Sequence, residues 1–178
     1  EHLKSHGNRV EKYKAAKSPL FRDALHHKAR RLRGAPVPTT ILANRDSEHA
    51  AYYLGFPAER KITFGLTNGD VKPEHIAASP TGTSFSISGQ SLRLSIPGVF
   101  NLANALPAYI IGNLLTIPSE QIAFGIESLK NIPGRMELVK EGQDFTVIID
   151  YAHEPASMTA LLDAAEHMRN GMQQGERD

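Results

Sequence analysis

The apolar run at residues 147–149 constrains the fold of this chain more than any other feature of its sequence. The run, Val-Ile-Ile, is typical of a buried strand, and an Asp-Tyr-Ala-His sequence follows it at 150–153. Pro155 then stands where proline is favoured, in the first turn of a helix. In α/β proteins such strand ends present polar groups to ligands. We therefore expect chemistry at the end of this strand.

The composition excludes several classes of protein. With 40% hydrophobic residues, 22% charged residues and a net charge of +1, the chain is expected to be soluble and globular. No apolar run is long enough to span a bilayer, and the first residues lack the apolar core of a signal peptide. The absence of cysteine excludes disulfides, thiolate zinc sites and cysteine nucleophiles. We expect a cytoplasmic protein without a membrane partner.

The charge is unevenly distributed along the chain. Residues 1–34 hold ten Lys or Arg against three acids, a local net charge of +7. This excess is compatible with a phosphate-bearing partner, either a nucleotide or a nucleic acid, and equally with a solvated helix face. No aromatic-rich platform for single strands accompanies the basic residues, so nucleic acid is not the expected partner.

Strand and helix patterns alternate along the chain, which indicates an α/β fold. Pro19 is expected to kink or split the first helix, and Ser47 and Ser119 are expected to cap later helices. The predicted elements are a helix at 8–33, strands at 39–43 and 61–64, a helix at 47–54, a hairpin of strands 83–88 and 92–96, helices at 101–115 and 119–130, strands at 136–140 and 145–149, and a helix at 155–168.

The Asn-Ile-Pro-Gly sequence at 131–134 punctuates the chain and predicts a domain boundary there. The last strand–helix unit has no later strand to pair with, so the chain looks cut off at its C-terminal end. No G-x-x-x-x-G-K-[ST] phosphate loop occurs in the 178 residues.

Four motifs in a fixed order carry a resemblance to a known family. They are E-H-L-K-x-H-G with Y-K-A-A-K-x-x-L-F within 1–21, G-V-F-N-L-A-N at 98–104, G-R-M-E at 134–137, and D-Y-A-H at 150–153. Together they resemble the Mur ligases, the ATP-dependent amide-bond-forming enzymes of peptidoglycan synthesis. The last two motifs are most similar to the MurE branch, the UDP-N-acetylmuramoyl-tripeptide synthetases. Each motif alone is weakly specific, but four in order across nearly the whole chain are strongly so.

The resemblance implies two domains. Residues 1–132 correspond to the later part of the central ATP-binding domain, a sheet with flanking helices and a β-hairpin, and residues 133–178 to the beginning of a Rossmann-like C-terminal domain. The phosphate loop would lie upstream of Glu1, and the segment that selects the amino acid downstream of Asp178. The chain is thus expected to be a fragment without activity of its own.

The implied reaction adds an amino acid to UDP-N-acetylmuramoyl-L-alanyl-D-glutamate at the expense of ATP, through an acyl phosphate. Two other interpretations remain open. One is a related amide ligase, cyanophycin-synthetase-like or folylpolyglutamate-synthetase-like. The other is a non-catalytic module that binds nucleic acid through its basic N-terminal helix.

His2 and Lys17 are the implied magnesium site. By resemblance, His2 is a ligand of Mg²⁺ beside the γ-phosphate, and Lys17 is carbamylated, which replaces a cation with an anionic oxygen ligand. Carbamylation requires an unprotonated amine, so the site must lower the pKa of the lysine. The alternatives are a histidine at a surface terminus and one more exposed lysine of a basic helix.

Asn101 and Asn104 lie one helical turn apart, so both can reach one ligand, and their amides match an adenine edge. Asp150 is expected to accept hydrogen bonds from ribose hydroxyls, with Tyr151 and His153 facing the same cleft. The alternative roles of Asn101 and Asp150 are helix caps.

Arg135 is expected to clamp phosphate at the hinge between the domains, with an interdomain salt bridge as its alternative. All these site residues are predicted to converge on one nucleotide-sized cleft. Four departures from the family pattern bear on catalysis. Lys4 replaces the usual Asp, Glu154 replaces the usual Thr, and Pro19 and Pro107 interrupt helices that are normally continuous.

Overall fold

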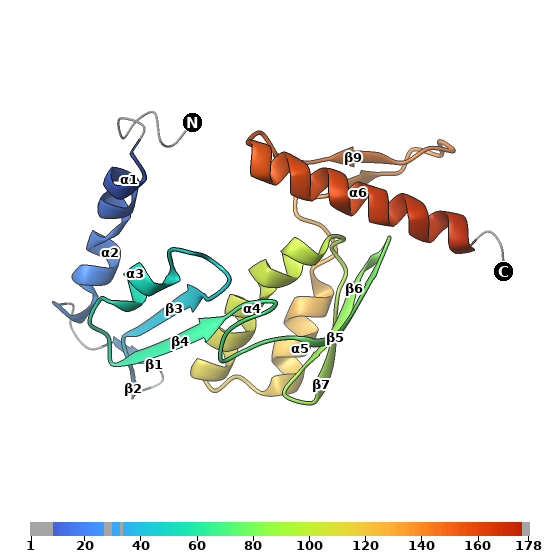
Figure 1. The fold of residues 1–178 in the computed structure, drawn as a ribbon. Helices are drawn as coiled ribbons and strands as arrows, with labels where there is room; N and C mark the ends of the chain where they lie inside the picture. Colours follow the sequence, from blue (N-terminus) through green and yellow to red (C-terminus); the bar gives the residue numbers. More distant parts are fainter. Residues whose placement is uncertain (1–8, 27–29, 33, 176–178) are drawn as a thin grey trace. The chain divides into compact units, whose positions relative to one another are not determined.

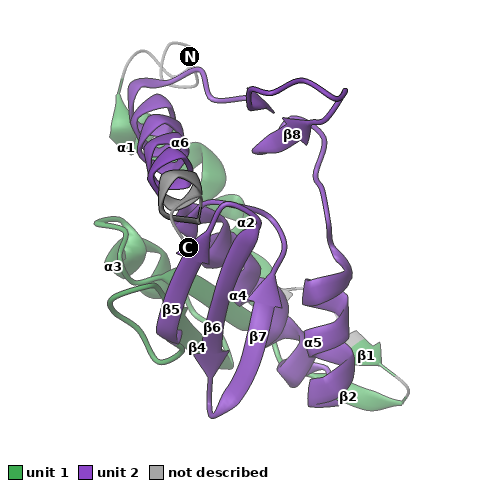
Figure 2. Cartoon of the chain, turned by 90° about the vertical axis from the view of Figure 1, so that its right-hand side faces the viewer, with its two compact units in different colours: residues 1–71 green, residues 72–178 purple. Residues whose placement is uncertain are grey.

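The computed structural model describes residues 9–26, 30–32 and 34–175, which belong to two compact units, residues 1–71 and 72–178 (Figures 1 and 2). Each unit mixes helices and strands, which confirms the predicted α/β class. The described residues include no helix that is both long and apolar enough to cross a membrane.

Unit 1 is built around a pair of parallel strands joined by a short helix. Parallel strands need such a crossover because a tight turn reverses the chain direction. The elements of this unit are α1 (Val10–Lys17), α2 (Pro19–Arg22), the 3₁₀ helix η2 (Ala24–His26), the antiparallel pair β1 (Arg30–Leu32) and β2 (Ala35–Val37), and the parallel pair β3 (Thr40–Asn44) and β4 (Arg60–Phe64) with α3 (Ala50–Leu54) between them.

The predicted first helix is only partly correct. Pro19 splits it as expected, because the proline occupies the first position of α2 directly after Ser18. Residues 30–32, however, form strand β1, so the prediction of helix there was wrong. Ser47 does not cap α3, whose N-cap is His49. The Ser47 hydroxyl instead accepts a hydrogen bond from the His49 backbone amide at 3.3 Å.

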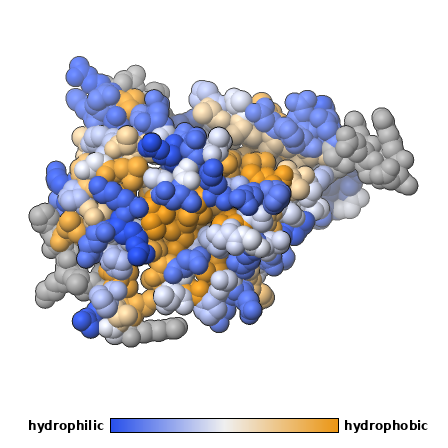
Figure 3. Space-filling view, turned by 60° about the horizontal axis from the view of Figure 1, so that its bottom comes forward, coloured by the Kyte–Doolittle hydropathy of each residue, from blue (hydrophilic) through white to orange (hydrophobic). Residues whose placement is uncertain are grey.

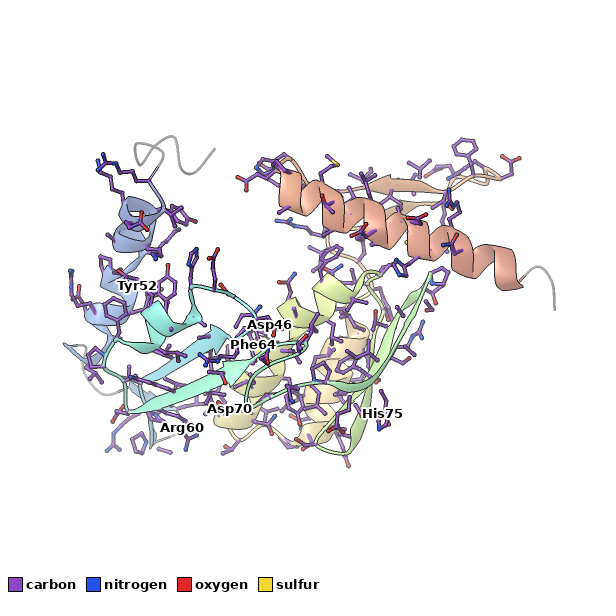
Figure 4. The ribbon with its side chains drawn as sticks, in the orientation of Figure 1. Asp46, Tyr52, Arg60, Phe64, Asp70 and His75 are labelled. Atoms are coloured by element: carbon purple, nitrogen blue, oxygen red, sulfur yellow. The ribbon has the colours of Figure 1, made fainter. Side chains whose placement is uncertain are left out.

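Asp46 fastens two loops of unit 1 together at the ends of β3 and β4 (Figure 4). Its carboxylate accepts hydrogen bonds from the backbone amides of Leu66 at 2.6 Å, Thr67 at 3.2 Å and Asn68 at 2.9 Å. Burial raises the pKa of Asp46. These three bonds and a fourth from the Asn68 side chain lower it by more, so the pKa lies below its usual value. The ionised carboxylate therefore stabilises this turn.

Unit 2 combines a three-stranded antiparallel sheet with two helices, a strand pair and a long final helix (Figure 2). Its elements are β5 (Glu74–Ser79), β6 (Gly82–Ile87) and β7 (Gln90–Leu94) in spatial order β5-β6-β7, then α4 (Val99–Leu114), α5 (Ser119–Ser128), the antiparallel pair β8 (Glu137–Val139) and β9 (Val147–Ile149), and α6 (Pro155–Gly175).

The hydrophobic core of unit 2 matches the regular spacing of apolar residues in the sequence. In α4, Leu102, Leu106 and Ile110 recur every four residues and are at most 4% exposed. Gly112 allows α5 to approach closely, since a Cβ there would lie 2.8 Å from the Ile122 side chain. The hairpin of β6 and β7 is confirmed, with residues 88 and 89 both at positive φ, as a two-residue turn requires.

Three details of unit 2 differ from the prediction. Strand β5 was not predicted. Ser119 is the first residue of α5 and Pro118 its N-cap, so Ser119 does not cap the helix. Helix α6 reaches Gly175, beyond the predicted end at 168.

Hydrophobic residues gather on the face shown in Figure 3. Some large apolar side chains are well exposed, among them Phe124 at 74% and Leu162 at 61%. Phe124 lies on α5, whose opposite face carries the buried Ile122 and Ile126, as is normal for an amphipathic helix.

Candidate nucleotide-binding site

A cavity of about 1050 Å³ in unit 2 brings four of the predicted site residues together. Asn101 and Asn104 reach it from α4, Arg135 from the turn before β8, and Asp150 from the end of β9. These residues span 50 positions of sequence, so their common cavity is a property of the fold.

Asn101 is buried, and its side chain also fastens the loop before α4. Its Nδ2 donates a hydrogen bond to the Pro97 carbonyl at 2.7 Å, and only 7% of the residue is exposed. The N-cap of α4 is Gly98, at φ 91°, so the alternative in which Asn101 caps the helix is wrong. Asn104 lies one turn further on, is exposed and lines the cavity. Its amide is therefore accessible to a ligand.

Asp150 joins the end of β9 to the turn that carries Arg135. One carboxylate oxygen accepts a hydrogen bond from the Met136 amide at 2.9 Å, and the other accepts one from the Ala152 amide at 2.7 Å. Neither of these bonds goes to a backbone amide of α6, which begins at Pro155. A carboxylate has about four acceptor positions, so Asp150 retains capacity for a hydroxyl of a ligand.

The G-R-M-E motif forms a tight turn whose geometry presents Arg135. The Glu137 carboxylate accepts hydrogen bonds from the Gly134 amide at 2.8 Å and from the Asn131 side chain at 3.3 Å. The bond from Gly134, and to a smaller extent the bond from Asn131, lowers the pKa of Glu137. The carboxylate therefore stays ionised and holds the turn. Glu137 thereby positions Arg135.

Neither Tyr151 nor His153 is among the residues that line the cavity. The Arg135 guanidinium is 5.7 Å from the centre of the Tyr151 ring, a cation–π contact. The rings of Tyr151 and His153 meet edge to face at 4.9 Å. These contacts orient Arg135, while any direct contact of Tyr151 or His153 with nucleotide stays a prediction.

The predicted magnesium ligands, His2 and Lys17, precede unit 2 in the sequence. His2 falls outside the described residues. Lys17 is exposed at the end of α1 in unit 1, with its ammonium 5.5 Å from the centre of the Tyr13 ring. The described residues contain no group of three or more His, Asp or Glu that could hold a metal ion. The roles of His2 and Lys17 as magnesium ligands stay predictions.

Most of the cavity wall was missed by the sequence analysis. It is largely apolar, with Phe100 from α4 and Ile122, Ile126 and Leu129 from α5 and its end. Ile122, Ile126 and Leu129 follow the helical spacing of one face, a signal that is present in the sequence. An apolar wall with a few polar groups is typical of a site for a small molecule or cofactor.

Comparison with known protein families identifies the family to which this chain belongs. The Mur ligase middle domain matches residues 1–112, and the Mur ligase, glutamate ligase domain matches residues 134–174. The chain belongs to the Mur ligase family.

Individual relatives agree with this assignment. The chain is 36% identical to the UDP-N-acetylmuramoyl-L-alanyl-D-glutamate--2,6-diaminopimelate ligase of Bacillus licheniformis, over 96% of this chain and 35% of that protein. The chain thus spans about a third of the length of the curated relatives that it matches.

Solved structures show the same fold. MurF from Acinetobacter baumannii superimposes with a TM-score of 0.73 at 22% identity, over 94% of this chain and 35% of that one. MurF from Thermotoga maritima, solved in complex with ADP, gives a TM-score of 0.70 at 17% identity, over 93% and 36%.

Proposed function

We propose that this chain contributes the adenine- and ribose-facing part of the nucleotide site of an ATP-dependent ligase. The ligase adds an amino acid to UDP-N-acetylmuramoyl-L-alanyl-D-glutamate in peptidoglycan synthesis. The cavity shared by Asn101, Asn104, Arg135 and Asp150 is the observation that carries the proposal. Family membership and the activity in the names of the relatives support it.

Each residue has a distinct task in this proposal. The adenine lies against the apolar wall of α4 and α5, where the Asn104 amide can both donate to and accept from its edge. Asp150 accepts a ribose hydroxyl with its remaining lone pairs. Arg135, oriented by Tyr151, offers a delocalised positive charge to the phosphates.

The chemistry then requires positioning and charge neutralisation. The γ-phosphoryl group passes from ATP to the D-glutamate carboxylate, which leaves ADP and an acyl phosphate. The amine of the incoming amino acid then attacks the acyl carbon, so that the amide forms, phosphate leaves and the amine loses a proton. Arg135 contributes by offsetting the negative charge on the transferring phosphoryl group. Because ATP is the phosphoryl donor, we place the reaction in the cytoplasm. Magnesium held by His2 and Lys17 is part of the same proposal, and no step here depends on it.

A chimaeric enzyme tests the proposal. The segment of the Bacillus licheniformis relative that aligns with this chain is replaced by the 178 residues. The amide product is then measured with ATP, UDP-N-acetylmuramoyl-L-alanyl-D-glutamate and 2,6-diaminopimelate. We expect product, and we expect Asn104→Ala in the chimaera to raise the KM for ATP about five- to tenfold, the effect of one lost hydrogen bond.

Asn113→Ala is the matched control, because Asn113 is an exposed asparagine of the same helix that does not line the cavity. Its KM for ATP should equal that of the parent chimaera. A chimaera that unfolds cooperatively yet makes no amide, or equal ATP kinetics in the Asn104 variant and the parent, would contradict the proposal.

A further inference from the structure

Unit 2 holds a second cavity, of about 440 Å³, with an unusually basic wall. Four cationic side chains line it: Arg93 from β7, Lys130 after α5, Arg135 before β8 and Lys140 after β8. None of the described residues that line this cavity is acidic. The cavity therefore concentrates positive charge.

Two of the cations are held in place by neutral groups. Arg93 donates through Nη2 to the Thr81 carbonyl at 3.1 Å and to the Thr81 hydroxyl at 2.8 Å. Lys130 donates through Nζ to the Ser95 hydroxyl at 3.3 Å and to the Glu127 carbonyl at 3.0 Å. These partners fix the side chains without cancelling their charges.

The neighbouring carboxylates are engaged elsewhere. Glu127 accepts a hydrogen bond from the Arg93 backbone amide at 3.2 Å. Glu137 holds the Gly134 amide and the Asn131 side chain. Neither carboxylate is part of the cavity wall.

We propose that this cavity binds a phosphate-type oxyanion with two or more negative charges. Like charges around a common space repel one another, and a multiply charged anion relieves that repulsion. A tetrahedral oxyanion presents several acceptor oxygens, so it can receive hydrogen bonds from several cations at once. Asn131 also lines the cavity, and because its amide nitrogen carries two N–H groups of which one donates to Glu137, the other adds an uncharged donor.

Arg135 lines both this cavity and the larger one described above. An oxyanion in the basic cavity therefore competes for the guanidinium that would otherwise face the larger cavity. The basic cavity itself requires no nucleotide, so the inference is independent of the proposed ligase function.

Titration of the 178-residue chain with inorganic phosphate and with pyrophosphate, followed by calorimetry at low ionic strength, tests the proposal. We expect saturable binding that weakens as salt is raised, because the cations are exposed. Arg93→Gln and Lys130→Gln should each weaken binding about tenfold, as expected for one charge-assisted hydrogen bond. Arg93→Lys keeps the charge and should retain most of the affinity.

Lys72→Gln is the matched control, since it removes the same charge from unit 2 at an exposed residue outside the cavity wall. Its affinity for phosphate should be unchanged. No saturable binding of either phosphate probe, an equal loss in the Lys72 variant, or equally tight binding of the dicarboxylate succinate would overturn the proposal. Uncharged adenosine, titrated in parallel, reports on the larger cavity and should bind the Arg93 variant and the parent alike.

Discussion

Asn101 and Asn104 share one cavity but differ in their expected effect on stability. Asn101→Ala removes the buried hydrogen bond from Nδ2 to the Pro97 carbonyl, whereas Asn104 is exposed. We therefore expect the Asn101 variant to be destabilised and the Asn104 variant to keep its stability, while both bind adenosine nucleotides more weakly.

The magnitude follows from the contact that is lost. Removing one partner of a buried hydrogen bond and leaving a carbonyl unsatisfied costs about 1–3 kcal/mol. With a urea slope of about 2 kcal/mol per M, the unfolding midpoint of the Asn101→Ala chain should fall by about 0.5–1.5 M. An exposed substitution such as Asn104→Ala changes the free energy of unfolding by no more than about 0.5 kcal/mol.

Urea unfolding followed by far-ultraviolet circular dichroism compares the two variants with the parent. Asn113→Ala again serves as the control for an exposed asparagine on α4. Equal midpoints for the Asn101 and Asn104 variants would show that the bond to Pro97 does not fasten the loop before α4, and would refute this reasoning.

Other predictions concern packing, pH and activity. Leu106→Ala empties a fully buried position in α4 and should lower the free energy of unfolding by about 2–5 kcal/mol in urea titrations; a loss below 1 kcal/mol would contradict the described core. The pKa of Asp46 is lower in the folded chain than the value of about 3.9 usual for unfolded Asp. Its stabilisation is therefore present above pH 4 and lost as the pH falls through the folded pKa. Asp46→Asn should make the urea midpoint less sensitive to acid between pH 5 and pH 3. An unchanged acid dependence would argue against stabilisation of the turn by the Asp46 carboxylate. The 178 residues alone contain no phosphate-loop pattern, so product analysis should detect no amide formation from ATP and the UDP-linked dipeptide; detectable product would overturn that expectation.

The success of the sequence-based predictions depended on how local each signal was. The hairpin of β6 and β7 was found because alternating apolar residues flank a short turn that contains Gly89. Strand β1 was missed because Arg30 and Arg31 show no alternation, and its pairing with β2 depends on tertiary context. Strand β5 was missed because residues 74–78 are all exposed, so no period of two appears in the sequence.

The candidate site was likewise predicted only where a local motif marks its residues. Motifs identified Asn101, Asn104, Arg135 and Asp150, and the structure brings these four to one cavity. The apolar wall and the basic cavity were not predicted, because their residues come from separate segments that only the fold brings together. The boundary at 132/133 and the convergence of Lys17 with this site remain predictions.

The central claim is that the cavity beside α4 binds the adenosine part of a nucleotide. Its most direct test is an NMR titration of the ¹⁵N-labelled 178-residue chain with ADP, in which weak binding can still be observed. The account predicts shifts of the Asn104 side-chain amide and contacts between adenine protons and the methyl groups of Ile122 and Ile126. Shifts confined to residues outside the cavity, or no shifts at saturating ADP, would contradict it.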